Sequence, residues 1–189
     1  MRLLIAGIIG AIVFFVWGML AHVALPIGEM GMQVANEQDA ALAALQVSAN
    51  KGEGVYMLPG MAPDKMSDTA AVAAFNEKYK ASPYAFVVYA PEGNPAMANM
   101  VPNLIKQFVS NLLAALVLAW VLSLGAFAFG QRVMIAGALA LFAWFVISVP
   151  YWNWYKFPMQ FTLEALIEQV VGWLLAGAAM AWWLGRKAH

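Results

Sequence analysis

The sequence predicts an α-helical integral membrane protein, a bundle of four transmembrane helices with a small α/β extracytoplasmic insertion between spans one and two. Two observations indicate this fold class. Of the 189 residues, 63% are hydrophobic and only 11% are charged, whereas a soluble domain of this length needs far more charge to cover its surface. In addition, four apolar segments approach or exceed the roughly 20 residues that an α-helix needs to cross a bilayer.

The first apolar segment precedes the insertion and the other three follow it closely. The apolar run of this first segment is longer than the roughly 7–15 residues of a signal-peptide core, and no clear cleavage site follows it. We therefore expect a retained anchor. The predicted organisation is span one at 1–25, the insertion at 26–102 and a three-span bundle at 103–189, with spans at about 104–127, 133–149 and 163–184.

The basic residues near the span ends predict the orientation. Short cytoplasmic flanks are enriched in lysine and arginine, and Arg2, Arg132 and Arg186 would all lie on one side of a four-span protein. Both termini are therefore expected in the cytoplasm and the insertion outside. Lys106 and Lys156 would lie on the outer side and count weakly against this orientation.

The insertion is the water-facing part and holds eight of the ten acidic residues and four lysines. We expect one helix after Asn36 and a second at 69–81, capped by Asp68, because both residues are favourable N-caps. The second helix has an apolar face that includes Phe75. The runs GVYMLP and YAFVVYA predict two strands. Two strands alone are marginal, so we expect the insertion to pack on the bundle or on a partner.

Two further helix starts are expected from prolines and N-cap residues. Asn94 followed by Pro95 predicts that span two begins as a helix above the membrane, with Pro102 as a kink. Thr162 is a favourable N-cap for span four, and Glu164 would then complement the positive end of the helix dipole.

Polar side chains gather in the outer halves of the spans, where an ionisable group is costly. Three amides on span two recur every four residues and share one stripe of the helix. Such amides often hydrogen-bond between helices, so the stripe indicates either helix packing or a binding site. The candidate residues for a ligand or ion are His22, Asn103, Gln107, Asn111, Glu164 and Glu168.

Glu168 is the candidate that packing explains least easily. At 1.5 Å per residue it lies about 8 Å below the predicted start of span four. An acid at such a depth usually faces the bundle interior or a water-filled cavity. We expect contact with His22 or a polar residue of span two, either as a structural pair or as part of a transport, metal or catalytic site.

Small residues predict which spans pack together. Residues of the type small-xxx-small let membrane helices approach closely. Span one contains Ala6 with Gly10 and Gly7 with Ala11. Because span four carries the same pattern, we expect spans one and four to pack against each other. Its small residues are Gly172, Ala176, Gly177 and Ala181.

An aromatic loop is predicted between spans three and four, flanked by Pro150 and Pro158. Tryptophan and tyrosine favour the membrane–water interface, which explains such a loop. An aromatic cage for a ligand is the alternative interpretation. The residues concerned are Tyr151, Trp152, Asn153, Trp154 and Tyr155.

Cysteine chemistry is excluded because the chain has no cysteine, and no zinc, P-loop, dinucleotide or nucleic-acid motif is present. Methionine pairs in the insertion are weak candidates for Cu(I), which prefers soft ligands. Methionine also fills irregular apolar surfaces, and this is the simpler explanation, so no cofactor is expected. The methionines concerned are Met30, Met32, Met97 and Met100.

The segments VWGMLAHVALPIGEMG and FAWFVISVPYWNWYKFP resemble those of four-span bacterial inner-membrane proteins whose domain has no known function. This resemblance implies a bacterial inner membrane but no activity. No catalytic residues are predicted, because the serines, His22 and the glutamates lack a diagnostic spacing. We expect a non-catalytic accessory or partner-binding protein with a polar groove in the outer leaflet. Its partners would be the lipid bilayer and a membrane protein or a second copy of itself. The alternative is a small-ligand, metal-ion or proton site at His22, Glu168 and Asn111.

Overall fold

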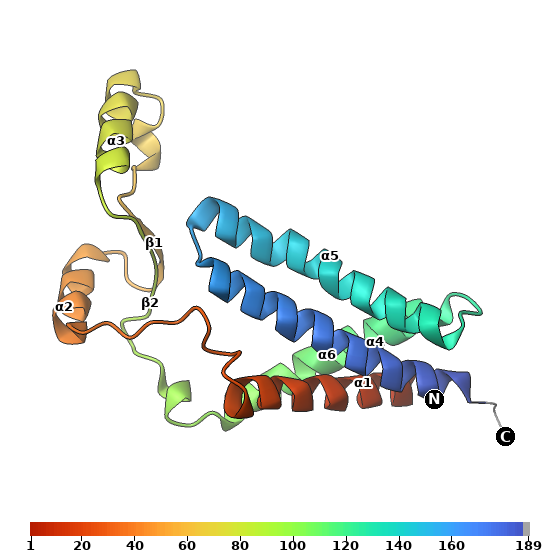
Figure 1. Ribbon diagram of the computed structural model, residues 1–189. Helices are drawn as coiled ribbons and strands as arrows, with labels where there is room; N and C mark the ends of the chain where they lie inside the picture. Colours follow the sequence, from red (N-terminus) through yellow and green to blue (C-terminus); the bar gives the residue numbers. More distant parts are fainter. Residues whose placement is uncertain (187–189) are drawn as a thin grey trace. The chain divides into compact units, whose positions relative to one another are not determined.

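The computed structural model describes residues 1–186, which divide into two units (Figure 1). The larger, helical unit joins Met1–Gln33 to Asn99–His189, and the smaller unit is Val34–Ala98. The coarse prediction is confirmed: four helices are long and apolar enough to cross a membrane, and a two-stranded sheet lies between the first and the second of them in sequence. Residues 26–33, which we had expected in the insertion, belong to the helical unit.

The helical unit contains four long helices. Helix α1, Arg2–Met19, continues as the π-helix η1, Leu20–Ala24, and is followed by α4, Val101–Ser123, α5, Phe129–Tyr155, and α6, Met159–Gly185. Helix α1 packs against α4 and α6, and α6 also packs against α5, whereas α4 and α5 meet at few positions. The neighbours therefore follow the order α4, α1, α6, α5.

Small residues allow α1 to approach its neighbours closely. A Cβ atom at Gly10 would lie 2.5 Å from the sulfur of Met180, and one at Gly172 would lie 2.7 Å from ring atoms of Phe14 and Trp17. The predicted packing of the first span against the fourth is therefore confirmed. The small residues named above are all buried: Ala6, Gly7, Gly10, Ala11, Gly172, Ala176, Gly177 and Ala181.

The predicted aromatic loop between spans three and four is wrong. Pro150 lies inside α5, which continues to Tyr155, so the aromatic residues form the last turns of this helix. Lys156 then adopts a left-handed conformation with φ of 59° and ends the helix. We had placed Pro150 at the edge of the loop, since proline is unfavourable inside a helix. A proline inside an apolar helix is tolerated where neighbouring groups satisfy the freed carbonyl.

Two predicted helix starts are also wrong. Pro102 lies in the first turn of α4 and causes no kink, because a first-turn proline has no intrahelical partner to lose. Helix α6 begins at Met159, with Pro158 as N-cap, and Thr162 is its fourth residue. The Thr162 hydroxyl donates to the carbonyl of Pro158 at 3.2 Å and does not cap the helix. Asn94 and Pro95 begin only the short 3₁₀ turn Pro95–Met97.

The smaller unit consists of α2, Gln38–Ser48, β1, Gly54–Leu58, α3, Thr69–Ala81, and β2, Ala85–Tyr89. The strands pair in antiparallel fashion, with Val55 opposite Val88. This confirms both predicted strands and the second helix. The N-cap position of α2 is Glu37 and not Asn36, and the Glu37 side chain makes no capping hydrogen bond.

The smaller unit has little core of its own. The carboxylate of Asp68 caps α3 by accepting hydrogen bonds from the N–H groups of Ala70 and Ala71, as predicted. Phe75 is half-buried, and its ring lies 5.4 Å from that of Tyr79 between centroids. A unit of two strands and two short helices buries little apolar surface.

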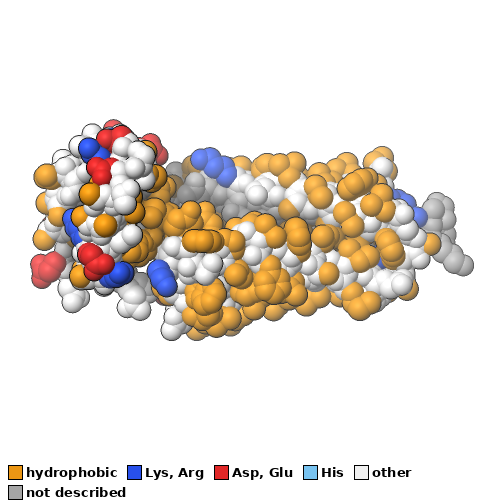
Figure 2. All heavy atoms as spheres, turned by 90° about the horizontal axis from the view of Figure 1, so that it is seen from above, with side chains coloured by type: hydrophobic (Ala, Val, Ile, Leu, Met, Phe, Trp, Pro, Cys, Tyr) orange, Lys and Arg blue, Asp and Glu red, His pale blue; other side chains and the backbone are white. Residues whose placement is uncertain are grey.

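The surface of the helical unit is mostly apolar. Phe142 and Trp120 are 64% and 57% exposed, and hydrophobic side chains cover most of the helices, whereas charged side chains gather on the smaller unit (Figure 2). Soluble proteins rarely expose such large apolar patches. The four apolar helices and this surface suggest a multi-pass membrane protein.

Basic residues share one end of the helical unit, as the sequence predicted. The Arg2 guanidinium donates to the carbonyl of Leu184 at 3.1 Å and to that of Arg186. Arg132 and Arg186 line one surface hollow. The start of α1 and the end of α6 are therefore tied together at this end.

Candidate functional site

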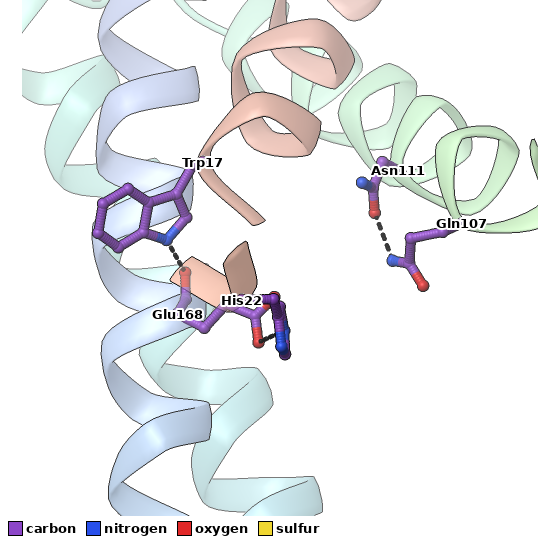
Figure 3. Close-up of polar contacts among 5 residues, drawn as sticks. All are labelled: Trp17, His22, Gln107, Asn111 and Glu168. Carbon is purple, nitrogen blue, oxygen red and sulfur yellow. Dashed lines mark hydrogen bonds and ion pairs between the residues drawn. The ribbon is translucent and has the colours of Figure 1, made fainter. Parts of the chain in front are cut away.

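His22 and Glu168 meet at the end of α1 that is remote from Arg2 (Figure 3). The distance from Nε2 of His22 to Oε2 of Glu168 is 3.6 Å. The Glu168 side chain is 24% exposed, and that of His22 is 49% exposed. We expected Glu168 to contact His22 or a polar residue of span two, and the contact with His22 is present. Because α6 begins at Met159, Glu168 lies about 14 Å from the start of the helix, farther than the roughly 8 Å that the sequence suggested.

The π-helix η1 and a glycine hold the imidazole in place. His22 lies within η1, and π-helical turns are often found at functional sites. The N–H of Gly28 donates to the carbonyl of Ala21 at 3.2 Å and folds the following chain back against η1. A Cβ atom at Gly28 would lie 1.9 Å from Nδ1 of His22. Only glycine leaves room for the ring here.

Trp17 connects α1 to the backbone of Glu168. Its indole N–H donates to the Glu168 carbonyl at 3.0 Å (Figure 3). Gly172, one turn further along α6, leaves the space that the indole occupies. Our sequence reasoning did not include Trp17 in the site. The available signal was a tryptophan inside an apolar span, since a buried indole N–H usually finds an acceptor.

Glu164 is buried beside this pair. Glu164 is 7% exposed, and its Oε2 atom has no hydrogen-bond partner within residues 1–186. His22, Glu168 and the backbone N–H of Met30 lie near its carboxyl group. We expected Glu164 in the first turn of the helix, but it is the sixth residue of α6. The helix N-terminus therefore does not explain its charge.

Two of the three predicted amides interact on α4. The Gln107 side-chain N–H donates to Oδ1 of Asn111 at 2.9 Å (Figure 3). Asn111 is buried, with 5% exposure, whereas Asn103 is exposed at the start of α4. The stripe therefore contributes Gln107 and Asn111 to the site but not Asn103.

A groove of about 470 Å³ separates α4 from α5 and is lined by Glu168, Gln107 and Asn111. Ser110 of α4 and Gln169 of α6 also line this polar end, and our prediction had not included Gln169. Farther along the helices the lining is apolar. It consists of Phe14, Ala114, Val117, Leu118, Ala136, Leu139, Ala140, Ala143 and Trp173.

Among the aromatic residues at the end of α5, Tyr151 lines a pocket of about 230 Å³, together with Ile147, Ser148, Phe157, Phe161 and Thr162. The ring of Tyr151 contacts those of Tyr155 and Phe157, with centroids 5.6 and 5.2 Å apart. Trp154 points outward and is 74% exposed. Trp152 is also exposed, at 40%, and so is Asn153. The exposed residues fit the predicted aromatic belt, while a binding site at Tyr151 stays a prediction.

The methionines considered for Cu(I) do not share one unit. Met97 belongs to the smaller unit, whereas Met30, Met32 and Met100 belong to the helical unit, and all four are exposed. Within residues 1–186, no three histidine, cysteine or acidic side chains are placed to hold a metal ion. The Cu(I) interpretation gains no support.

The site offers hydrogen-bonding and acid–base groups next to an apolar wall. In the described part of the chain, Ser110 makes no hydrogen bond to His22 or to either glutamate. The arrangement is suited to binding a polar group on an apolar support. Comparison of the chain with known protein families, with curated proteins and with solved structures found no match.

Proposed function

We propose that this protein is a bacterial inner-membrane accessory protein that binds a transmembrane helix of a partner in the groove between α4 and α5. In this proposal it belongs to the four-span family that its sequence resembles, and its role is binding, not catalysis. The smaller unit faces the periplasm and both termini face the cytoplasm.

The observation that carries the proposal is the groove between α4 and α5. The other neighbouring pairs of helices pack closely, whereas these two helices are held apart. The walls of the groove combine small side chains, such as Ala114, Ala140 and Ala143, with amides. In membranes, helices associate through small residues and interhelical hydrogen bonds. The groove therefore has the chemistry of a helix–helix interface.

The amides have hydrogen-bonding capacity left for an occupant. Oδ1 of Asn111 accepts from Gln107, and within residues 1–186 the side-chain N–H₂ of Asn111 has no partner. The donor lies on a side chain that is 95% buried, since Asn111 is 5% exposed. A polar side chain on a partner helix would satisfy it.

The proposed orientation is supported by the distribution of charge. Arg2, Arg132 and Arg186 lie at one end of the helical unit, and short basic flanks favour the cytoplasm. The His22–Glu168 pair would then lie in the outer half of the membrane, on the same side as the smaller unit.

Photo-crosslinking in native membranes tests the occupant. A photoreactive residue at Ala143, which lines the groove, should give an adduct with one discrete membrane protein. The matched control is Phe142, the adjacent residue on the exposed face, which should give none. Adducts with lipid alone at Ala143 would refute a partner helix.

A blocking substitution tests whether the groove is the site of association. With the photoreactive residue at Ser110, across the groove, Ala143→Trp should abolish the adduct by filling the space. Val146→Trp introduces the same bulk on an exposed position of α5 and should leave the adduct intact. An adduct that survives Ala143→Trp contradicts the proposal.

A further inference from the structure

Glu164 is a carboxylate that nothing in the proposed groove explains. It does not line the groove, it is 93% buried, since its exposure is 7%, and its Oε2 has no hydrogen-bond partner in the part of the chain that the structure describes. An ionised oxygen in such a place has lost its hydration and gained no donor. The side chain therefore needs either a different charge state or a ligand.

Glu164, Glu168 and His22 form a cluster in which the acidic groups outnumber the basic group by one. Glu168 lies one helical turn from Glu164, and His22 is the basic group next to both. With all three groups ionised, two negative charges face one positive charge, which leaves a net charge of −1 in apolar surroundings. One additional proton makes the cluster neutral.

The surrounding elements supply no further charge to Glu164. The segment after η1 contributes the backbone N–H of Met30, while the side chain of Glu29 is exposed. Helix α5 contributes Trp144, whose indole N–H donates to the Thr162 carbonyl at 2.8 Å. Helix α4 contributes the amides of Gln107 and Asn111 and one charged residue at this end of the unit, Lys106, whose side chain is exposed and does not act on Glu164. His22 and Glu168 are thus the charged groups that act on Glu164 within residues 1–186.

The number of available ligands favours a proton over a metal ion as the occupant of the site. The chain after η1 lies tightly on α6 three residues before Glu164, because a Cβ atom at Gly31 would lie 2.3 Å from Cβ of Phe161. A metal ion prefers several oxygen ligands, and residues 1–186 provide no group of three suitable side chains for a metal.

We propose that Glu164, Glu168 and His22 form a proton-binding site in which the carboxyl group of Glu164 carries one proton. Glu168 lines the groove and contacts His22, so it provides the route by which this proton exchanges with the outer side. The site goes beyond the proposed binding of a partner helix and does not require a partner to be present.

Infrared difference spectroscopy of the full chain in lipid nanodiscs tests this site. Protonated and ionised carboxyl groups absorb at different frequencies, so a pH titration counts acids that hold a proton. The wild-type protein should show one protonated carboxyl per chain at neutral pH, and it should disappear on alkaline titration. Glu164→Gln should lack this band, because the amide keeps the shape of the side chain but has no acid.

Two further variants keep the test interpretable. Glu29→Gln removes an exposed acid from the same end of the unit and should leave the band unchanged. His22→Gln should retain the band and shift the midpoint of its titration, which also tests the site if Glu164→Gln does not fold.

Three results would overturn the proposal. They are the absence of a protonated carboxyl in the wild-type protein, a band that persists in Glu164→Gln, and a band that sodium or calcium removes at constant pH. The last result would identify a metal cation as the occupant.

Discussion

Replacing Gly172 with alanine tests the packing on which the position of Glu168 depends. A Cβ atom at Gly172 would lie 2.7 Å from Cε2 of Phe14 and from Cδ1 of Trp17, so both rings must move. This movement would also break the hydrogen bond from Trp17 to the Glu168 carbonyl. Gly130 is a matched control, since a Cβ atom there meets nothing within 4 Å.

The expected magnitude comes from comparing the two variants. Alanine in place of glycine favours a helix interior by about 1 kcal/mol, which applies to Gly172, and by less at Gly130, the second residue of α5. Overpacking at Gly172 costs about 1–3 kcal/mol, and the lost hydrogen bond costs about 0.6 kcal/mol. Gly172→Ala should therefore be less stable than Gly130→Ala by about 0.5–3.5 kcal/mol.

Unfolding in mixed micelles with increasing dodecyl sulfate, followed by circular dichroism, gives the two free energies of unfolding. The indole N–H resonance of Trp17 should also shift in Gly172→Ala and stay in place in Gly130→Ala. Equal stability of the two variants would refute the close contact between α1 and α6 at this position.

The remaining predictions concern orientation and the smaller unit. Because the chain has no native cysteine, Asn50→Cys should react with an impermeant thiol reagent in whole cells and Gly130→Cys should not; the reverse would overturn the orientation. Asp68→Ala should destabilise the smaller unit by about 1 kcal/mol through loss of the α3 cap, and an unchanged unfolding midpoint would argue against this role. Phe75→Ala should cost about 2 kcal/mol, below the roughly 3–5 kcal/mol of a fully buried ring. A full-sized loss would mean that a partner or the bundle covers Phe75.

The long helices could be predicted from the sequence, whereas some of their ends could not. Apolar runs alone identify the four helices, and Asp68 locates the start of α3 because its side chain acts locally. Pro150 and Thr162 were misplaced for a common reason. Local preferences suggested a helix end at each residue, but the apolar helices continue through Pro150 and begin before Thr162.

The part of the site that depends on how deep a polar residue lies in its span could be predicted from the sequence. The part that depends on tertiary contacts could not. The position of Glu168 well inside a span was enough to predict contact with a polar partner, His22 or a residue of span two, and His22 is the partner observed. The sequence could not show that Gly28 and Gly31 fold the chain over η1 and the start of α6. Without that fold, Glu164 looked like a helix-terminal acid and not a buried one.

The two proposed sites share one residue, and this links them thermodynamically. Glu168 lines the groove and also contacts His22, so the charge on the acidic cluster is part of the polar surface that an occupant meets. A donor on a partner helix that bonds to the Glu168 carboxylate would favour its ionised form. Any such preference is reciprocal, because binding free energies at coupled sites must change each other by the same amount. If both proposals hold, the affinity for the partner depends on whether Glu164 carries its proton. The affinity for an occupant that does not contact Glu168 does not depend on this proton.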